Sequence, residues 1–527
     1  MKLTRRSWIL AGAAIAVIAA AWALSPLHKV NHLSARLLGR SPVADGYVVK
    51  VGPAGEVLGA GTSVAPGERI GFALNAASSQ EIIPTITGAS GKVIATLPAA
   101  PVAPHAPQGD APWLEGAGYP VAFSWTVPQS FPSGVYYLNG LPDIFLVVKP
   151  LPAPPPEVMV LMPTNTLNAY STTLGRSLYK QPTMVTAVNF LRPQSIEKAA
   201  EWTGFLRWAT ERHPFGAASV GYIADADMDR KGALDGVKLL VVVGHSEYWT
   251  RAARQTFDAF IARGGNAIMA GGNDMWWQTR YSDDGKTMYV YRVAKTPDQG
   301  GDPIADPLLK TAYWHNKQLG YPTLPSIGGD FTYGGYGQRG KENGQFRSTM
   351  TIASDRSPLL AGLGVKDCEE IETPRSGEYD GAPIAGLDDA GRPVPNTAMI
   401  GASRFELIGF EWNHNGPRLM LGTMHVMQHA TGSGYVLHMG GRGCCMGDEF
   451  YSGPGRGSAA IQAILRNAAA LFLAGGDPFT HDAAQRAVAY PMTTPWLKAL
   501  PEGAPSQCAP NEPDDPDSVR AESSDAN

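Results

Sequence analysis

Two hydrophobic patterns follow one another along the chain and predict two kinds of fold. Between residues 45 and 150, short β-branched runs are separated by clusters of glycine, proline and other turn-forming residues. Short strands at this regular spacing predict an immunoglobulin-like β-sandwich over residues 45–150. The runs expected to form its strands are residues 47–51, 70–74, 92–95, 122–127 and 144–148.

A proline-rich linker ends near residue 156, and beyond it apolar runs alternate with stretches of helical period. Strands that alternate with helices predict an α/β domain over residues 157–475, built on a doubly wound parallel sheet. The expected helix at 250–263 has clear ends, because Thr250 can cap its start and the glycines at 264 and 265 can stop it. The other expected elements are strands at 158–162, 184–190, 237–243 and 267–270, and helices at 195–212 and 458–473.

Two further segments carry weaker patterns. Residues 286–440 show only short β-like runs among scattered aromatic residues, glycine and proline, and we expect a loop-rich insertion that covers the site. Residues 509–527 are acidic and poor in apolar side chains, which is typical of a disordered tail.

The first 24 residues have the composition of an export signal. Lys2, Arg5 and Arg6 precede an apolar stretch, and residues 21–23 have the small-x-small form of a cleavage site. Residues 4–10 resemble a twin-arginine signal, although an ordinary secretory signal and an uncleaved membrane anchor through residues 8–24 stay open as alternatives. We therefore expect an exported protein, either periplasmic or anchored to the membrane and facing the periplasm.

Composition narrows the classes of partner. A formal net charge of −4 and a pI near 6.3 provide no general attraction to nucleic acid or to anionic membrane surfaces, so we expect no nucleic-acid partner. Four cysteines in 527 residues are too few for a disulfide framework. The sequence leaves open the disulfide state of Cys368, Cys444, Cys445 and Cys508.

Three polar loops follow predicted strands and carry the candidate chemistry. The first contains Tyr170 and Tyr179, the second is the turn at residues 245–248, and the third is the glycine-rich segment at residues 271–277. Parallel strands place their carboxyl ends at one edge of a sheet, where ligands of α/β proteins bind. We therefore expect the three loops to converge on one site.

Short motifs occur in a fixed order along these loops. They are Asn168-Ala169-Tyr170, Ser177-Leu178-Tyr179, Arg192-Pro193, His245-Ser246-Glu247-Tyr248-Trp249 and Gly271-Gly272-Asn273 followed by tryptophan. Together they resemble the large (β) subunit of N,N-dimethylformamidase and its relatives, over roughly residues 157–473. The resemblance implies a glutamine-amidotransferase-like α/β domain that hydrolyses a small amide with a mononuclear Fe(III) ion.

Carried over residue by residue, the resemblance makes Tyr170 and Tyr179 phenolate ligands of the iron and Glu247 its carboxylate ligand. Hard oxygen donors suit a highly charged ion, and three ligands leave positions open for water and substrate. The resemblance also implies a catalytic part for His245 in proton transfer to the leaving amine. Asn273 would donate a hydrogen bond to the developing oxyanion.

Helical geometry constrains this ligand set. Nine residues turn a side chain by about 900°, which places Tyr170 and Tyr179 on opposite faces of a straight helix. The chain must therefore bend between them, and Gly175 is the residue best suited to the bend. Tyr248 follows Glu247 directly and should point away from it, so we expect Tyr248 to be structural.

Other interpretations stay open at this stage. A serine hydrolase using Ser246 would need a second glycine at the position of Tyr248, whose bulk opposes the tight turn. A non-catalytic envelope protein that binds a ligand or a polysaccharide is the main alternative to an enzyme. The motifs do not identify the natural amide, and they do not say whether the chain assembles with a small subunit or with further copies of itself.

Overall fold

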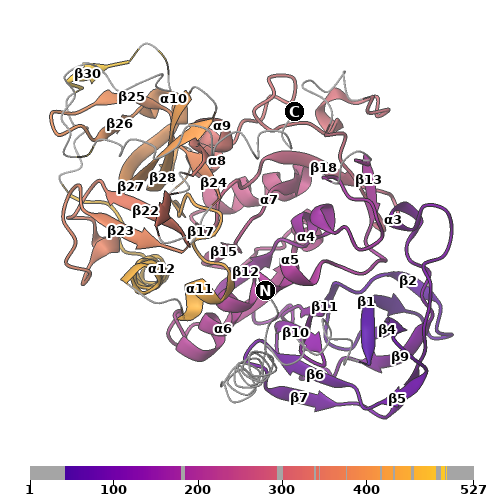
Figure 1. The fold of residues 1–527 in the computed structure, drawn as a ribbon. Helices are drawn as coiled ribbons and strands as arrows, with labels where there is room; N and C mark the ends of the chain where they lie inside the picture. Colours follow the sequence, from indigo (N-terminus) through magenta and orange to yellow (C-terminus); the bar gives the residue numbers. More distant parts are fainter. Residues whose placement is uncertain are drawn as a thin grey trace, which may run out of the picture.

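The computed structural model describes residues 42–179, 184–292, 301–337, 340–342, 345–374, 377–415, 418–430, 432, 434–452, 456–481, 488–492, 494 and 508. The predicted export signal and the predicted acidic tail lie outside these residues. The chain forms a β-rich N-terminal part beside a larger part of mixed α and β structure (Figure 1). Among the described helices, none combines the length and the apolar character needed to cross a bilayer.

Two sheets enclose a common apolar core in the N-terminal part, as the sequence predicts for this β-rich region. All five predicted runs overlap a strand. Phe72 of one sheet and Ile144 and Leu146 of the other are fully buried in that core. One sheet has the order β2 (Val57–Ala60), β1 (Val43–Val51), β4 (Arg69–Ala76) and β9 (Val121–Thr126), and the other β3 (Ser63–Val64), β11 (Leu141–Val148), β10 (Gly134–Leu138), β6 (Thr85–Gly88) and β7 (Val93–Thr96).

A large mixed sheet forms the centre of the second part. Its first five strands are parallel, and the remaining strands are antiparallel to their neighbours. A purely parallel sheet is therefore not what the chain forms. The strand order is β14 (Val220–Ala224), β12 (Val158–Met162), β15 (Leu239–Val243), β17 (Asn266–Ala270), β29 (Tyr435–His438), β28 (Arg418–His429), β27 (Ala402–Asn415), β20 (Gly335–Tyr336) and β24 (Glu378–Gly381).

The antiparallel half of the sheet corrects the prediction of a loop-rich insertion over residues 286–440. The long hairpin of β27 and β28 joins the central sheet, and β22 (Gln345–Ile352) pairs with β27 and with β23 (Glu370–Thr373). The hairpin escapes sequence analysis because it buries polar residues such as Asn413, Thr423 and His425, each fully enclosed. These residues break the alternation that marks a strand.

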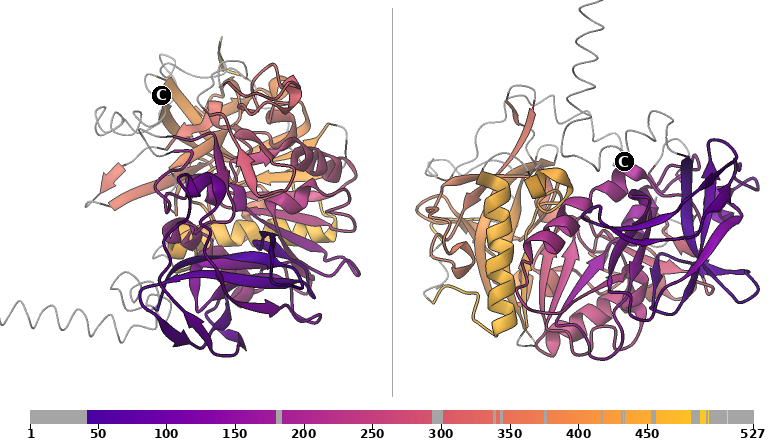
Figure 2. Two further views of the ribbon diagram at one scale, coloured as in Figure 1. Left: turned by 90° about the vertical axis from the view of Figure 1, so that its right-hand side faces the viewer. Right: turned by 90° about the horizontal axis from the view of Figure 1, so that it is seen from below.

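Helices cover both faces of the central sheet. Phe257 and Phe260 of α7 (Arg251–Ala262) pack on one face, and α6 (Thr203–Arg212) and α12 (Arg456–Ala474) pack on the other. Figure 2 shows α12 as a long helix lying along the sheet. Thr250 caps α7 as predicted, because its hydroxyl accepts a hydrogen bond from the Ala253 amide.

Two predicted elements differ from the structure. The helix expected at 195–212 is split into α5 (Ile196–Ala200) and α6, and Trp202 between them packs edge-on against Phe145 of the β-rich part. The strand expected at 184–190 shortens to β13 (Ala187–Asn189), which pairs with β19 (Thr287–Tyr289) instead of joining the central sheet. The small sheet that contains it also holds β18 (Trp277–Tyr281) and β16 (Tyr248–Thr250).

The remaining elements are short. The strands are β5 (Gln80–Ile82), β8 (Ala100–Val102), β21 (Gly340–Glu342), β25 (Ile384–Leu387), β26 (Pro393–Pro395) and β30 (Tyr490–Pro491). The helices are α3 (Pro112–Glu115), α4 (Thr164–Tyr170), α8 (Leu324–Ile327), α9 (Phe331–Gly334), α10 (Thr397–Ile400) and α11 (Gly447–Ser452), with 3-10 turns at Asp225–Asp229, Pro307–Leu309 and Pro358–Leu360.

Candidate active site

The three predicted loops meet at the carboxyl ends of β12, β15 and β17. Hydrogen bonds join them, because the Glu247 amide donates to the Thr166 hydroxyl (2.9 Å) and the Ser246 amide donates to the Asp274 carboxylate (3.0 Å). The Met275 amide returns a hydrogen bond to the Ser246 carbonyl (2.8 Å). The loops therefore form one connected unit.

Three oxygen atoms that the sequence singled out lie together in this unit. Glu247 Oε2 accepts hydrogen bonds from Tyr170 Oη (3.1 Å) and from Tyr179 Oη (2.5 Å). The two tyrosine rings stack with their centroids 3.8 Å apart. The chain bends between them as expected, because α4 ends at Tyr170 and Gly175 adopts a φ of 87°. The structure thus brings the proposed ligand set within hydrogen-bonding distance.

His245 lies beside this group of oxygens. Its Nδ1 is 3.0 Å from the Gly272 carbonyl oxygen, which accepts a hydrogen bond from the protonated nitrogen. Its Nε2 therefore faces the site, 3.1 Å from Tyr170 Oη, 3.2 Å from Glu247 Oε2 and 3.3 Å from Glu378 Oε2. The imidazole is placed to exchange a proton with any of these groups.

Glu378 is a site residue that lies outside the sequence motifs, and its acidic neighbourhood alone gives no reason to prefer it to a surface loop residue. It begins β24 in the antiparallel half of the sheet, where the sequence predicted only loop. Asn273 Nδ2 donates a long hydrogen bond to Glu378 Oε2 (3.5 Å). Asn273 adopts a left-handed φ of 52°, and its Oδ1 is buried without a hydrogen-bond partner among the described residues. Glu378 thus faces both His245 and Asn273.

Tyr248 also belongs to the site, which corrects the expectation that it is purely structural. Its hydroxyl donates a hydrogen bond to Tyr179 Oη (2.5 Å), and its ring is buried. Arg292 lies over the face of the Tyr179 ring, with the guanidinium carbon 3.6 Å from the ring centroid. Tyr179 is therefore held from two sides.

Ser246 lacks the setting of a nucleophile. Its side chain is 1% exposed, and its hydroxyl accepts a hydrogen bond from Trp249 Nε1 (3.0 Å). A serine hydrolase needs its hydroxyl open to substrate and in contact with a base. The geometry therefore gives the serine-hydrolase interpretation no support.

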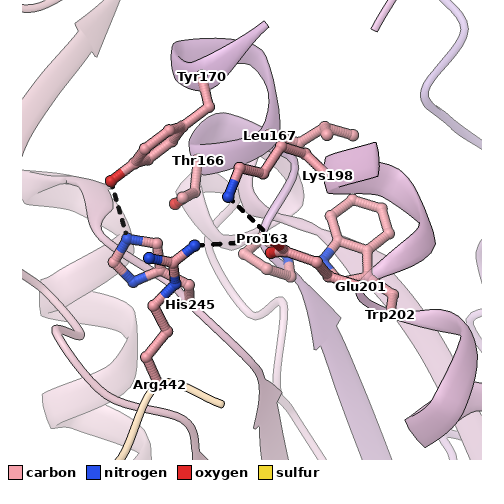
Figure 3. Close-up of a pocket in the computed structure, with 9 residues that line it drawn as sticks. All are labelled: Pro163, Thr166, Leu167, Tyr170, Lys198, Glu201, Trp202, His245 and Arg442. Carbon is pink, nitrogen blue, oxygen red and sulfur yellow. Dashed lines mark hydrogen bonds and ion pairs between the residues drawn. The ribbon is translucent and has the colours of Figure 1, made fainter. Parts of the chain in front are cut away.

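A narrow pocket, open to solvent, leads to Tyr170 and His245 (Figure 3). Charged side chains line its rim, where Lys198 Nζ is 2.9 Å from Glu201 Oε1. Arg442 lies 3.7 Å from Glu201 and 3.5 Å from Glu378. The remaining lining residues, Pro163, Thr166, Leu167 and Trp202, are mostly apolar.

Burial and neighbouring charges set the protonation of the site before any ion binds. Burial raises the pKa of Tyr170 and of Tyr179 well above 10, and the Glu247 carboxylate adds to both shifts. Burial lowers the pKa of His245, but the carboxylates of Glu378 and Glu247 outweigh it, so that pKa lies above its usual value. Burial raises the pKa of Glu247, but His245, Arg292 and the Tyr179 hydroxyl together outweigh burial, so that the pKa of Glu247 is lowered.

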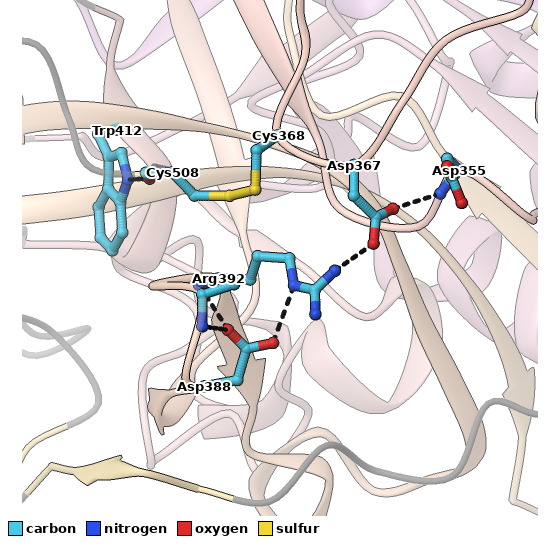
Figure 4. The surroundings of a disulfide bond; sticks show 8 residues. Asp355, Asp367, Cys368, Asp388, Arg392, Trp412 and Cys508 are labelled. Atoms are coloured by element: carbon cyan, nitrogen blue, oxygen red, sulfur yellow. Dashed lines mark hydrogen bonds and ion pairs between the residues drawn. A yellow bond between two sulfur atoms is a disulfide. The ribbon is translucent and has the colours of Figure 1, made fainter. Parts of the chain in front are cut away.

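The cysteines lie in two pairs. A disulfide joins Cys368 to Cys508, 140 residues apart (Figure 4), and the Cys508 carbonyl accepts a hydrogen bond from Trp412 Nε1 (3.4 Å). The adjacent Cys444 and Cys445 are also paired with each other. Neither pair contains a residue of the proposed ligand set.

Comparison with known proteins places the chain in a family. No curated protein matches it. A solved structure of a ThuA-like protein from Bacteroides uniformis ATCC 8492 is similar at 12% identity and a TM-score of 0.28, covering 62% of this chain and 96% of that one. A family model described as N,N-dimethylformamidase beta subunit-like, C-terminal, matches residues 85–442, which is more than half of the chain. The chain therefore belongs to the N,N-dimethylformamidase beta subunit-like family.

Proposed function

We propose that this protein is an exported, iron-dependent hydrolase that cleaves the C–N bond of a small amide. Family membership supports an amide-hydrolysing enzyme. The observation that carries the proposal is the meeting of Tyr170 Oη and Tyr179 Oη on a single carboxylate oxygen of Glu247. These oxygens lie beside His245, whose Nε2 is 3.1 Å from Tyr170 Oη and 3.2 Å from Glu247 Oε2.

The donor set fits a single Fe(III) ion. Ligand oxygens at about 2 Å from one ion lie about 3 Å from each other. The oxygen of Glu247 is 3.1 Å from that of Tyr170 and 2.5 Å from that of Tyr179, which needs only a small adjustment. Phenolate and carboxylate are hard donors, which favours a hard, highly charged ion. Tyr170, Tyr179 and Glu247 would therefore hold the iron.

Bound iron would supply Lewis acidity, which polarises the amide carbonyl and makes a water molecule more acidic. The protein would supply the rest of the chemistry. His245 Nε2 can take up a proton beside Glu378 and transfer it to the leaving nitrogen as the C–N bond breaks. The Asn273 side-chain amide can donate a hydrogen bond to the oxygen that gains charge. Water adds to the carbonyl carbon, so the products are a carboxylic acid and an amine.

Metal analysis and visible absorption of the purified full-length protein test the ligand set. We expect one iron per chain and the colour of a ferric phenolate in the wild type. Tyr179→Phe removes one ligand oxygen, so we expect less bound iron and a weaker or shifted absorption band. Tyr136→Phe is the matched control, because its hydroxyl lies in the β-rich part and donates a hydrogen bond to the Pro132 carbonyl (2.9 Å).

Amide hydrolysis is measured on the same preparations with a panel of small neutral amides. We expect turnover by the iron-loaded wild type and by Tyr136→Phe, with turnover by Tyr179→Phe falling in step with its loss of iron. A folded wild type that takes up no iron, or that keeps stoichiometric iron and the same colour after Tyr179→Phe, would refute the proposal.

A further inference from the structure

A second polar cluster lies behind the candidate active site. Asp274, Asp380 and His438 are 2%, 0% and 0% exposed, and one ligand atom of each lies within 4.8 Å of the others. His438 Nε2 is 3.1 Å from Asp380 Oδ2 and 3.7 Å from Asp274 Oδ2. Such a cluster needs an explanation, because a buried charge is costly unless it is paired.

The cluster is connected to the loops that carry the site. Asp274 follows Asn273, and its Oδ1 accepts the hydrogen bond from the Ser246 amide, between His245 and Glu247. Asp380 lies two residues after Glu378 in β24, and its Oδ2 accepts a hydrogen bond from the Asp274 amide (2.8 Å). The two carboxylates therefore link the three loops with the strand that supplies Glu378.

The protonation of His438 follows from its backbone contact. The Gly440 amide donates a hydrogen bond to His438 Nδ1 (2.9 Å), so this nitrogen carries a lone pair. A neutral imidazole then has its proton on Nε2, which faces the two carboxylates. A metal ion at this position would need a lone pair on Nε2. Burial lowers the pKa of His438 to about 3, which agrees with a neutral ring.

The two buried imidazoles supply no positive charge to the cluster. Burial raises the pKa of both aspartates and outweighs the effect of His245, which lowers the pKa of each. His425 stacks on His438 with ring centroids 5.3 Å apart, and burial lowers its pKa to about 3 as well. Its Nε2 donates a hydrogen bond to the Ile327 carbonyl oxygen (2.9 Å). Asp274 and Asp380 therefore have no positive partner in these two imidazoles, and keeping both carboxylates ionised in the buried cluster would cost free energy.

A proton between the two carboxylates resolves this conflict. Asp274 Oδ2, Asp380 Oδ1 and His438 Nε2 are buried and have no hydrogen-bond partner among the described residues, and one ligand atom of each side chain lies within 4.8 Å of the others. Two carboxylates that share a site hold one proton between them, as in other paired-acid sites. Burial raises the pKa of both aspartates well above the usual range, and the charge of Asp380 adds to the shift of Asp274.

We propose that Asp274 and Asp380 form a proton-sharing carboxylate pair that positions Asn273, the His245–Glu247 turn and Glu378 for catalysis. The positioning part of this inference rests on the proposed amide hydrolysis. The protonation part does not, because it concerns only the buried pair. Asp380 acts here through the backbone and does not touch substrate.

Variants of Asp380 in the full chain separate positioning from simple packing. Asp380→Asn can accept the hydrogen bond from the Asp274 amide and can donate its own N–H where the shared proton lies. We expect it to keep kcat within about threefold of wild type. Asp380→Ala loses both contacts, and misplacement of the loops should lower kcat by about a hundredfold with little change in KM. Asp143→Asn, a buried aspartate in the β-rich part, is the control.

Two readouts do not depend on activity. The infrared spectrum of the wild type should contain carbonyl bands of buried carboxylic acids, one of them from Asp225, whose pKa burial raises to about 8. Asp380→Asn should remove a band that Asp225→Asn and Asp143→Asn both keep. Hydrogen exchange at the Ser246 and Asp274 amides should be faster in Asp380→Ala than in Asp380→Asn. Both measurements remain decisive if the wild type proves inactive on every amide tested.

Several outcomes would overturn the inference. One is an Asp380→Asn spectrum that keeps every carboxylic-acid band of the wild type. Another is an Asp380→Asn variant that is as damaged as Asp380→Ala, since the amide should replace the shared proton. A third is the loss of a second bound metal equivalent in Asp380→Asn, which would identify the cluster as a cation site.

Discussion

His245 has one ring nitrogen fixed by the backbone, Nδ1, and one surrounded by carboxylates, Nε2. The Gly272 carbonyl holds the proton on Nδ1, and carboxylate oxygens of Glu247 and Glu378 lie within 3.3 Å of Nε2. Because these carboxylates raise the pKa of His245, the ring can hold a proton near neutral pH and release it to a leaving amine. Its part in the reaction is distinct from that of the ligand oxygens.

Replacing His245 should therefore separate chemistry from metal binding. We expect His245→Gln to lower kcat by about 10²- to 10⁴-fold, the usual contribution of a general acid. Iron content and the ferric phenolate band should stay close to wild type, because His245 is not in the proposed ligand set. Single-turnover rates and metal analysis of the same preparation measure the two effects. Loss of iron together with activity would show that His245 acts by holding the metal site.

Asp225, which is not part of the proposed ligand set, should make the stability of the folded chain depend on pH. Burial raises its pKa from 3.8 to about 8, while its Oδ2 accepts hydrogen bonds from the Asn165 amide (2.7 Å) and the Thr164 hydroxyl (3.4 Å). Between these two pH values the unfolded chain loses the proton and the folded chain keeps it. This contribution to stability is therefore complete below pH 3.8 and disappears as the pH rises through about 8.

The variant Asp225→Asn removes this titration and keeps an oxygen that can accept both hydrogen bonds. We expect the free energy of unfolding of wild type to fall relative to the variant between pH 4 and pH 8, by on the order of a few kcal/mol. Urea unfolding at several pH values measures the difference. A constant difference across this range would contradict the raised pKa.

The site residues differ in how far the sequence could predict them. Tyr170, Tyr179 and Glu247 stand in sequence motifs, so the family resemblance alone is enough to predict them. Glu378 lies in a strand with no recognisable pattern, and no local signal marks it. The hydroxyl of Tyr248 donates a hydrogen bond to Tyr179 Oη, although the two residues are 69 positions apart in the sequence. Contacts of this kind depend on the tertiary fold.

At the scale of elements, the chain segments that follow β15 and β17 come into close contact at two glycines. The turn after β15 and the loop after β17 touch backbone to backbone, and a Cβ on Gly271 would lie 1.8 Å from the Gly244 carbonyl oxygen. Gly244 itself adopts a φ of 68°. This close approach lets the two loops exchange the hydrogen bonds that align Glu247 with Asn273.

Adding one methyl group at this contact should disrupt the site. We expect Gly271→Ala to lower the free energy of unfolding by at least about 2 kcal/mol, because backbone atoms must move apart. Iron binding should weaken as well. Gly59→Ala in β2 is the matched control, since a Cβ there meets no atom within 4 Å, and thermal unfolding compares the two. Equal melting temperatures for both variants would contradict the close contact between the loops.

The elements that the sequence predicted best have strong local signals. Thr250 caps α7, and β12, β15 and β17 are short apolar runs buried on both faces. The hairpin of β27 and β28 was missed, because buried polar residues such as Asn413 replace the alternation that would reveal it. Asn413 Nδ2 is satisfied by the Gly334 carbonyl (2.8 Å), a partner far away in sequence.

At the scale of the whole molecule, the β-rich part and the central sheet share an apolar cluster. Phe145 and Val147 of β11 belong to the same cluster as Val158 of β12 and Trp202 before α6. Lys149 and Asp227 add an ion pair across this boundary (3.1 Å). The two parts therefore support each other, and Trp202 continues from this contact into the wall of the pocket.

The disulfide between Cys368 and Cys508 constrains the part of the chain that contains β27 and β28. It closes a loop of 140 residues that includes β27 and β28. We expect Cys508→Ser to lower the free energy of unfolding by about 2–4 kcal/mol, the usual range for removing such a bridge. Amide hydrolysis at 25 °C should persist, because the bridge lies outside the site. A melting temperature that responds neither to this variant nor to reductant would contradict the bridge.

The central claim is that Tyr170, Tyr179 and Glu247 hold one iron ion. Anomalous diffraction at the iron absorption edge, from crystals of the iron-loaded wild type, tests this most directly. We predict a single strong peak bonded to the two phenol oxygens and to Glu247 Oε2. An absence of any peak at these three oxygens, or a peak at Asp274, Asp380 and His438 instead, would contradict the claim.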